Sequence, residues 1–242
     1  MEEKTAYLDN AATTRACPAA VEAAARMMRD CFGNPSSLHA MGLASAREMA
    51  AAREAVAALL GCQAECVTFT SGGSEANNLA VFGGAAARAR RGKKLVTTAA
   101  EHSSVSEAMR RLESEGWEVA YVKPGPDGKL DAGAFADAVD ERTALVSMML
   151  VNNETGAIFP VAEAAKRIRR KNPGNIRLHL FVHYNLALSV ICAPSCLAIS
   201  ELLAVPIATK IPSIPTVSWS AKRICSTRSL PSKAKIFLSS TG

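Results

Sequence analysis

The chain has 242 residues, 49% of them hydrophobic, and 28 Lys and Arg against 22 Asp and Glu give a formal net charge of +6. This length and apolar content exclude a disordered or fibrous protein and predict one large or two modest cored domains. The N-terminus MEEKTAYLDN is acidic and polar, and no long uncharged apolar run follows, so we expect a cytoplasmic protein without membrane segments.

The positive charge is concentrated in one part of the chain. Residues 173–242 contain seven Lys or Arg and a single acid, Glu201, whereas residues 1–172 hold 21 of each sign. The basic residues of this tail are scattered among Ser, Pro and Ile, so nucleic-acid binding is not expected. Seven cysteines without a CxxC pair argue against a disulfide framework or a zinc site, and no metal site is predicted.

The first 172 residues alternate between helix and strand patterns. Pro18 begins a helix that runs to about Asp30, and Ser36 and Ser37 are predicted to cap a long helix that ends at Gly61. Further strands are predicted at 67–70, 94–98, 117–122 and 143–150, and further helices at 75–88, 103–115, 132–141 and 161–170. Strands separated by helices indicate an α/β fold, a mainly parallel sheet with helices on both faces.

Polar clusters follow three of these strands: 71-SGGS-74, 101-EHS-103 and 152-NNE-154. In a parallel sheet the carboxyl ends of the strands share one edge, where ligands bind. The first cluster begins a helix, so its amide N–H groups, with the hydroxyls of Ser71 and Ser74, are suited to hold a phosphate. Each cluster alone also fits ordinary loop chemistry, but three on one edge favour a site. GxGxxG and Walker motifs are both missing, so dinucleotide binding and a P-loop are poorly supported.

Five segments in order, 7-YLDNAATT-14, 32-FGNPSSLH-39, 68-TFTSGGSEANNLA-80, 101-EHSSV-105 and 150-LVNNETGAIFPV-161, resemble the cysteine desulfurases of the class V aminotransferase group. These are fold-type I enzymes that depend on pyridoxal 5'-phosphate (PLP). The match covers residues 5–172. The resemblance implies a PLP-transferase fold-type I large domain, incomplete in this chain, with an N-terminal segment, over residues 1–172.

The resemblance also implies roles for four residues. The N–H of Gly73 and the N–H and hydroxyl of Ser74 would bind the PLP phosphate. His102 would stack on the pyridine ring and act as an acid-base group, which suits an imidazole that titrates near neutral pH. Asn153 would donate to the phenolic oxygen without adding a charge. The alternative for Asn153 is a loop-capping amide.

Past residue 172 the family pattern stops. In the family the next strands supply an Asp for the pyridinium nitrogen, a Gln near the phenolic oxygen and a Ser-x-His-Lys segment whose Lys forms the Schiff base with PLP. A later loop carries the Cys that accepts sulfur as a persulfide. Residues 173–242 contain no Asp, and 218-SWSAKR-223 lacks the His, so Lys222 is interpreted as accidental. None of the seven cysteines stands at a matching position.

Residues 173–242 are therefore predicted to be a divergent basic Ser/Pro-rich tail. This segment has eleven Ser and six of the eleven Pro, and no sustained helical or strand period. One hypothesis is a reading-frame shift near residue 173, and the alternative is a real C-terminal module. Reading the encoding DNA in the other two frames separates them, because a frame shift should restore the Asp, Gln and His-Lys motifs.

The expected function is that of the PLP-dependent cysteine desulfurase lineage. Such a protein converts L-cysteine to L-alanine and transfers sulfur to acceptor or scaffold proteins for iron-sulfur cluster or thio-cofactor synthesis, as a homodimer by analogy. As written, the chain is expected to be inactive or impaired. Alternatives are another class V activity, such as selenocysteine lyase or aminotransferase, and a catalytically dead binding or dimerisation protein. A further alternative is a chain that folds poorly because apolar faces such as 143–150 have no cover.

Overall fold

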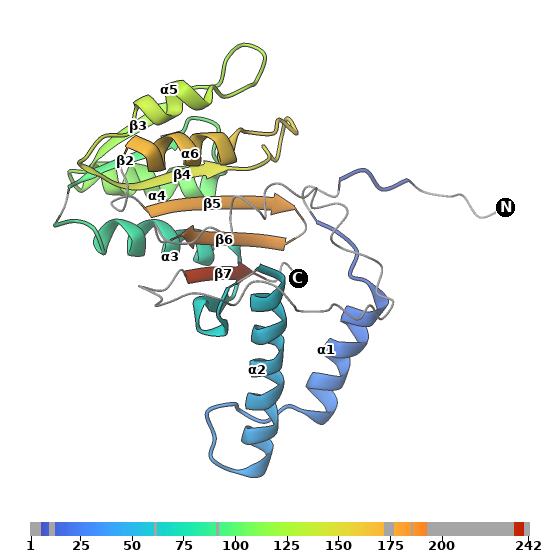
Figure 1. The fold of residues 1–242 in the computed structure, drawn as a ribbon. Coiled ribbons are helices and arrows are strands. Elements are labelled where there is room, and N and C mark those ends of the chain that lie inside the picture. The colour runs from blue at the N-terminus through green and yellow to red at the C-terminus, as the bar shows by residue number, and fades with distance from the viewer. Residues whose placement is uncertain are drawn as a thin grey trace, which may run out of the picture.

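Figure 1 shows the chain in a computed structural model. The structure describes residues 6–9, 13–60, 62–90 and 92–171, together with the backbone of three further strands at 177–184, 186–192 and 235–239. Gly61, the predicted stop of the long helix, and Lys222 lie outside the described residues.

Helices and strands alternate as the sequence predicts. The helices are α1 (Pro18–Asp30), α2 (Ala40–Leu60), the 3-10 turn η1 (Ala64–Cys66), α3 (Gly73–Ala86), α4 (Ser103–Ser114), α5 (Ala132–Asp137) and α6 (Val161–Lys171). The strands are β1 (Val67–Thr70), β2 (Lys94–Thr98), β3 (Glu118–Val122), β4 (Thr143–Met149), β5 (Arg177–Tyr184), β6 (Leu186–Cys192) and β7 (Lys235–Ser239). The bounds of β1 to β4 agree with the prediction to within a single residue.

The start of α2 differs from the prediction that Ser36 and Ser37 cap this helix. The helix begins at Ala40, and His39 before it accepts the N–H of Gly42 at Nδ1, at 3.3 Å. The preceding turn folds back onto the helix so closely that a Cβ on Gly42 would lie 2.3 Å from the carbonyl oxygen of Ser37. The two serines therefore lie in this turn, ahead of the helix start.

Helix α5 is shorter than the predicted 132–141 because Asp140 holds the chain in a turn. Its carboxylate accepts the N–H of Arg142 at 2.9 Å and the ammonium of Lys94 at 2.9 Å. These bonds fix the residues just before β4 in a conformation that does not continue the helix. At the other end, Asp131 caps α5 by accepting the N–H of Ala134 at 2.6 Å.

The seven strands form one sheet in the order β1-β7-β6-β5-β4-β2-β3. Strands β1 and β7 pair in parallel, as do β5 with β4, β4 with β2, and β2 with β3. Strand β6 is antiparallel to both of its neighbours. Figure 1 shows strands β4 to β7 of this mixed sheet one above another in the body of the molecule. The prediction of a mainly parallel α/β sheet is confirmed.

The core lies on both faces of the sheet because successive strand side chains point to opposite sides. One cluster joins Leu95 and Leu145 to buried residues of α3 and α4, and the other joins Val96 and Val146 to α5 and α6. All seven residues of β4 are buried. The concern that 143–150 would have nothing to cover it is therefore wrong in this structure.

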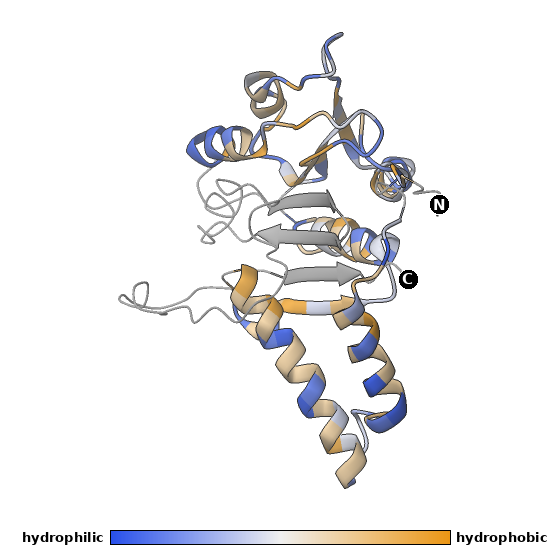
Figure 2. Cartoon of the chain, turned by 90° about the vertical axis from the view of Figure 1, so that its right-hand side faces the viewer, coloured by the Kyte–Doolittle hydropathy of each residue, from blue (hydrophilic) through white to orange (hydrophobic). Residues whose placement is uncertain are grey.

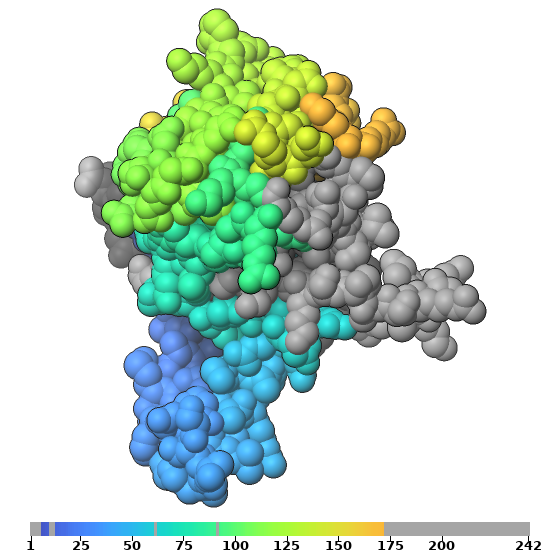
Figure 3. Space-filling view, turned by 90° about the vertical axis from the view of Figure 1, so that its left-hand side faces the viewer, coloured from blue at the N-terminus to red at the C-terminus, as the bar shows by residue number. Residues whose placement is uncertain are grey.

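Helices α1 and α2 project from this body, as Figures 2 and 3 show from opposite sides. No residue of α1 is buried, and α2 buries only Gly42, Ser45 and Ala57. The guanidinium of Arg26 on α1 donates to the carboxylate of Glu48 on α2 at 3.1 and 2.9 Å. Among the described residues, this helical pair is thus held to a large extent by polar contacts rather than by a core.

Three segments of the tail join the sheet, although the sequence indicated no strand period there. Strands β5, β6 and β7 occupy the middle of the sheet, between β4 and β1. The tail therefore contains strands, although its sequence shows no sustained strand period. Strand β5 pairs with β4, β7 pairs with β1, and β6 lies between β5 and β7. The division of the chain at residue 172 stays a prediction.

Candidate functional site

The turn after β1 leaves backbone N–H groups exposed at the start of α3. Gly72 precedes the helix in an extended conformation, with φ 179° and ψ 170°, and a Cβ there would meet nothing within 4 Å. The N–H groups of Gly73 and Ser74 lie in the first turn, where helical acceptors are lacking. Ser74 is exposed. This end of α3 therefore presents donors and a positive dipole end to solvent.

Ser71 belongs to the same turn, but its donors are occupied. The carboxylate of Glu75 accepts from the Ser71 hydroxyl at 2.6 Å and from the Ser71 N–H at 2.7 Å. Both hydrogen bonds lower the pKa of Glu75, and the bond from the hydroxyl has the larger effect. Ser71 was predicted to help hold a phosphate, whereas here it holds the carboxylate of Glu75. Of the two serine hydroxyls in this turn, that of Ser74 is the better placed for an external anion.

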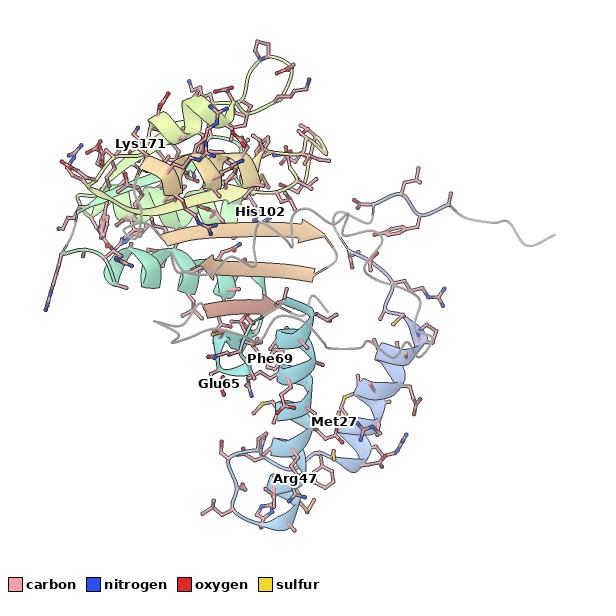
Figure 4. The ribbon with its side chains drawn as sticks, in the orientation of Figure 1. Met27, Arg47, Glu65, Phe69, His102 and Lys171 are labelled. Carbon is pink, nitrogen blue, oxygen red and sulfur yellow. The ribbon has the colours of Figure 1, made fainter. Side chains whose placement is uncertain are left out.

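His102 is the N-cap residue of α4, and its ring is held by Ser104. Nδ1 of His102 accepts the N–H of Ser104 at 3.1 Å and lies 2.8 Å from the Ser104 hydroxyl. The same hydroxyl accepts from Nδ2 of Asn77 at 2.7 Å. Asn77 is fully buried on α3, one turn after Gly73. The contact therefore joins the first turns of α3 and α4 beside His102. Figure 4 shows His102 in the body, apart from the projecting helices that carry Met27 and Arg47.

Asn152 connects the loop after β4 to the loop after β2. Its Nδ2 donates to the carbonyl of Ala100 at 3.0 Å, and its Oδ1 accepts the N–H of Glu154 at 3.1 Å and the N–H of Thr155 at 2.8 Å. The loop closes where the N–H of Gly156, a left-handed residue with φ 72°, donates to the carbonyl of Asn152 at 2.9 Å. Asn152, at 8% exposure, is thus the loop-capping amide.

Asn153 differs from its neighbour. Its side chain is half-buried and makes no hydrogen bond within the part of the chain that the structure describes. The sequence left two interpretations of Asn153 open, a ligand-binding amide and a loop-capping amide. The capping role belongs to Asn152, so the amide of Asn153 is available to a ligand. The binding role of Asn153 stays a prediction.

Glu101 links the same two strand ends. Its Oε1 accepts the N–H of Met149, at the end of β4, at 2.8 Å. The residue as a whole is partly exposed, but its carboxyl group is buried, and Oε2 has no partner among the described residues. Burial, opposed by the bond from Met149 and one from Thr98, raises the pKa of Glu101 to about 8. A neutral carboxyl is therefore expected at pH 7.

The three predicted clusters are thus joined at one edge of the sheet. Asn77 and Ser104 join the start of α3 to that of α4, and Asn152 and Glu101 join the end of β2 to that of β4. The sequence analysis gave no role to Asn77, Ser104 or Glu101. A signal for Asn77 was present, because it is a polar residue on the Ala-rich stripe of α3 that faces the core.

No disulfide joins Cys17, Cys31, Cys62 and Cys66, the cysteines whose side chains the structure describes. Within the described part of the chain, no three His, Cys, Asp or Glu side chains gather as a metal site would require. Nor is any helix there long and apolar enough to span a bilayer.

Comparison with known proteins identifies the family. The aminotransferase class-V family model matches residues 6–177. The chain belongs to this family. A cysteine desulfurase of Cereibacter sphaeroides is 45% identical over 166 residues, which are 68% of this chain and 43% of the relative. A cysteine desulfurase of Enterobacter agglomerans is 35% identical over 222 residues, 91% of this chain and 50% of the relative. The latter alignment is too long for residues 1–172 alone and includes part of the tail.

Solved structures agree with this assignment. A NifS-like protein superposes with a TM-score of 0.69 at 35% identity, over 72% of this chain and 47% of its own. SspA in complex with cysteine superposes with a TM-score of 0.67 at 32% identity, over 73% of this chain and 50% of its own. The resemblance to class V proteins and the predicted fold class are confirmed. The chain spans half or less of the length of these relatives.

Proposed function

We propose that this chain carries the PLP-binding part of a protein of the cysteine desulfurase lineage. The observation that carries the proposal is the joining of three polar loops at one sheet edge through Asn77, Ser104 and Asn152. Membership of the class V family and similarity to proteins named cysteine desulfurases support it.

The residues at this edge suit the chemical groups of PLP. The first N–H groups of α3 and the exposed hydroxyl of Ser74 match a phosphate, and the open space beside Gly72 leaves room for one. The amide of Asn153, without a partner among the described residues, matches a phenolic oxygen. Gly73, Ser74, His102 and Asn153 would therefore hold the cofactor.

Each of these residues has a distinct part in the proposed chemistry. When bound, PLP supplies a ring that withdraws electrons from the substrate's α-carbon. The start of α3 would hold the phosphate and so orient the ring. His102 would stack on it and donate to the substrate through Nε2–H, because Nδ1 accepts from Ser104. Asn153 would donate to the phenolic oxygen and keep the ring in one orientation.

L-cysteine is the substrate class that we propose. The names of the relatives support it, as does the structure of SspA, which was solved with cysteine. Transfer of sulfur to acceptor or scaffold proteins for iron-sulfur cluster or thio-cofactor synthesis is proposed by analogy. The homodimer and the cytoplasmic location stay predictions, and selenocysteine lyase or aminotransferase activity stays the alternative within the family.

Turnover by this chain is proposed to be low. Residues 173–242 contain no Asp and no Ser-x-His-Lys segment, which the resemblance associates with the reactive cofactor. The second candidate function, a PLP-fold binding protein without turnover, is favoured by the same observation. The alignment with the Enterobacter agglomerans relative favours a real C-terminal module over a frame shift. The encoding DNA around codon 173 tests these two origins.

Cofactor binding is tested by titrating the purified chain with PLP and following the PLP absorbance. The substitution Ser74→Ala should weaken binding about tenfold, because it removes a hydrogen bond to a charged phosphate. Inorganic phosphate should compete. Ser103→Ala is the matched control, since Ser103 is also an exposed serine in the first turn of a helix. Equal affinity in all three proteins would contradict a phosphate site at Ser74.

Turnover is tested by incubating the PLP-loaded chain with L-cysteine and measuring alanine. Little or none is expected. Borohydride treatment followed by intact mass measurement shows whether PLP is bonded to a Lys. Rapid alanine release together with a borohydride-fixed adduct would contradict the proposed low turnover and would favour a competent desulfurase.

A further inference from the structure

The contact between α3 and α4 has a consequence for the chemistry of His102. Asn77, Ser104 and His102 form a chain of hydrogen bonds from the buried face of α3 to the imidazole. Asn77 Nδ2 lies 2.7 Å from the Ser104 hydroxyl, which lies 2.8 Å from Nδ1 of His102. The N–H of Ser104 reaches the same Nδ1 at 3.1 Å.

The donors in this chain decide which nitrogen carries the ring proton. A backbone N–H can only donate, so Nδ1 must accept and holds no proton. Because Nδ1 already accepts the Ser104 N–H, the Ser104 hydroxyl is the donor in its contact with Nδ1, while its oxygen accepts the amide hydrogen of Asn77. Two donors therefore meet at Nδ1, and the proton of the neutral ring lies on Nε2.

We propose that Asn77 and Ser104 are positioning residues that fix His102 as the Nε2–H tautomer and hold its ring orientation. Asn77 is fully buried, and Ser104 is half-buried in the first turn of α4, so both are held by their helices. A proton on Nδ1 would break the bond from the Ser104 N–H and would oblige the Ser104 hydroxyl to accept instead of donate. The neutral ring therefore presents Nε2–H as a hydrogen-bond donor. The relevance of that nitrogen to a substrate rests on the proposed function, whereas the tautomer does not.

The tautomer is measured by two-bond ¹H–¹⁵N correlation spectra of the imidazoles, on the full chain without PLP. The chain has four histidines, and the signals of His102 are assigned by their loss in His102→Gln. The wild-type spectrum should show the Nε2–H pattern, with a hydrogen-bonded Nδ1. A wild-type ring that is mostly Nδ1–H would overturn the proposal.

The hydroxyl is tested with three variants of the first turn of α4. Ser104→Ala keeps the backbone N–H but removes the hydroxyl, and should raise the Nδ1–H fraction about fivefold. Ser104→Thr restores a hydroxyl and should restore the wild-type pattern. Ser103→Ala removes a neighbouring hydroxyl that does not contact His102 and should change nothing. Circular dichroism checks that the Ser104→Ala variant is folded. If this folded variant leaves the His102 signals unchanged, the positioning role of Ser104 is wrong.

The cofactor experiment separates this inference from the proposed function. Failure of the chain to bind PLP, with the Nε2–H pattern intact, would reject the proposed function and keep the inference. Binding of PLP to a chain whose His102 carries its proton on Nδ1 would support the proposed function and reject the inference about the tautomer. Asn77→Ser keeps a donor near the Ser104 hydroxyl and should leave the His102 pattern closer to wild type than Asn77→Ala does.

Discussion

The amino and carboxyl ends of strands β2, β3 and β4 differ in whether their polar side chains are paired. At the amino end, Lys94 pairs with Asp140 at 2.9 Å and with Glu118 at 3.7 Å. Arg142 pairs with the same two acids, Glu118 at 3.1 Å and Asp140 at 3.3 Å. Each of these four charges therefore has two partners of opposite sign.

At the carboxyl end, polar atoms remain without partners in the described part of the chain. Oε2 of Glu101 is buried without a hydrogen bond, and the side chain of Asn153 makes none. Asn152, by contrast, uses both atoms of its amide to hold the loops. The comparison indicates that the amino end is held by mutually paired charges, whereas the carboxyl end combines a scaffold with polar groups that have no partner among the described residues.

The largest effect is expected from Asn152, which is part of the scaffold. Asn152→Ala removes the bond to Ala100 and leaves two N–H groups of the loop without their acceptor, which should cost about 3 kcal/mol of unfolding free energy in urea. Asn153→Ala is the matched control and should change stability little while weakening PLP binding. Equal losses of stability in the two variants would contradict the division of roles.

A smaller effect is expected from Glu101, and it depends on pH. The pKa of Glu101 is raised to about 8 from the ordinary 4.5, so between these values the folded chain holds a proton that the unfolded chain has lost. Its contribution to stability is full below pH 4.5 and is lost as the pH rises through about 8. Unfolding free energies should therefore fall by about 2 kcal/mol between pH 5.5 and 7.5.

The isosteric variant Glu101→Gln tests this pH dependence. Its amide oxygen can still accept the N–H of Met149, and its NH₂ group replaces the protonated oxygen without titrating. Urea unfolding of this variant should depend less on pH over the same range, and the variant should be the more stable protein at pH 8. Parallel pH profiles for the two proteins would show that the Glu101 carboxyl is not held neutral.

The smallest effect is expected at the amino end. Burial alone would raise the pKa of Asp140. The hydrogen bonds from Lys94 and from the N–H of Arg142, together with the positive charges of these two side chains, outweigh burial and lower the pKa below its ordinary value. Lys94→Met should cost about 1 kcal/mol at pH 7, because the ammonium is largely buried between two carboxylates. The loss should shrink below pH 3.8 as Asp140 is protonated. PLP binding should not change, and a large change would contradict the separation of the two ends.

The helices and strands of residues 1–171 could be predicted because their signals are local. Helix periodicity, the Pro at the start of α1 and apolar runs such as 143–149 act over a few residues, and the strand bounds agree with the structure. The start of α2 could not be predicted, because it depends on the close contact of Gly42 with the carbonyl of Ser37. Strands β5 to β7 were missed because no sustained period marks them in the sequence, and β7 pairs with β1 from a distant part of the chain.

The candidate site was predictable as a set of loops but not in its internal order. The sequence placed Gly73, Ser74, His102 and Asn153 after strands of a parallel sheet, which share one edge. The sequence left open whether Asn153 binds a ligand or caps the loop, and it did not distinguish the two nitrogens of His102. These distinctions depend on which atoms of Ala100 and Ser104 lie within hydrogen-bonding distance.

By itself, the sequence determined the order of helices and strands over residues 1–171, the family and the loops that carry polar groups, because these follow from periodicity and short motifs. Only the tertiary structure decided that Glu101 is buried enough to be neutral, that Asn152 is the scaffold amide and that Nδ1 of His102 is an acceptor. Glu101 is buried and bonded to Met149, Asn152 reaches Ala100, and the hydroxyl that contacts His102 is bonded to Asn77, so each property also involves a distant part of the chain. Neither burial nor the identity of a distant partner is encoded in the few residues around it.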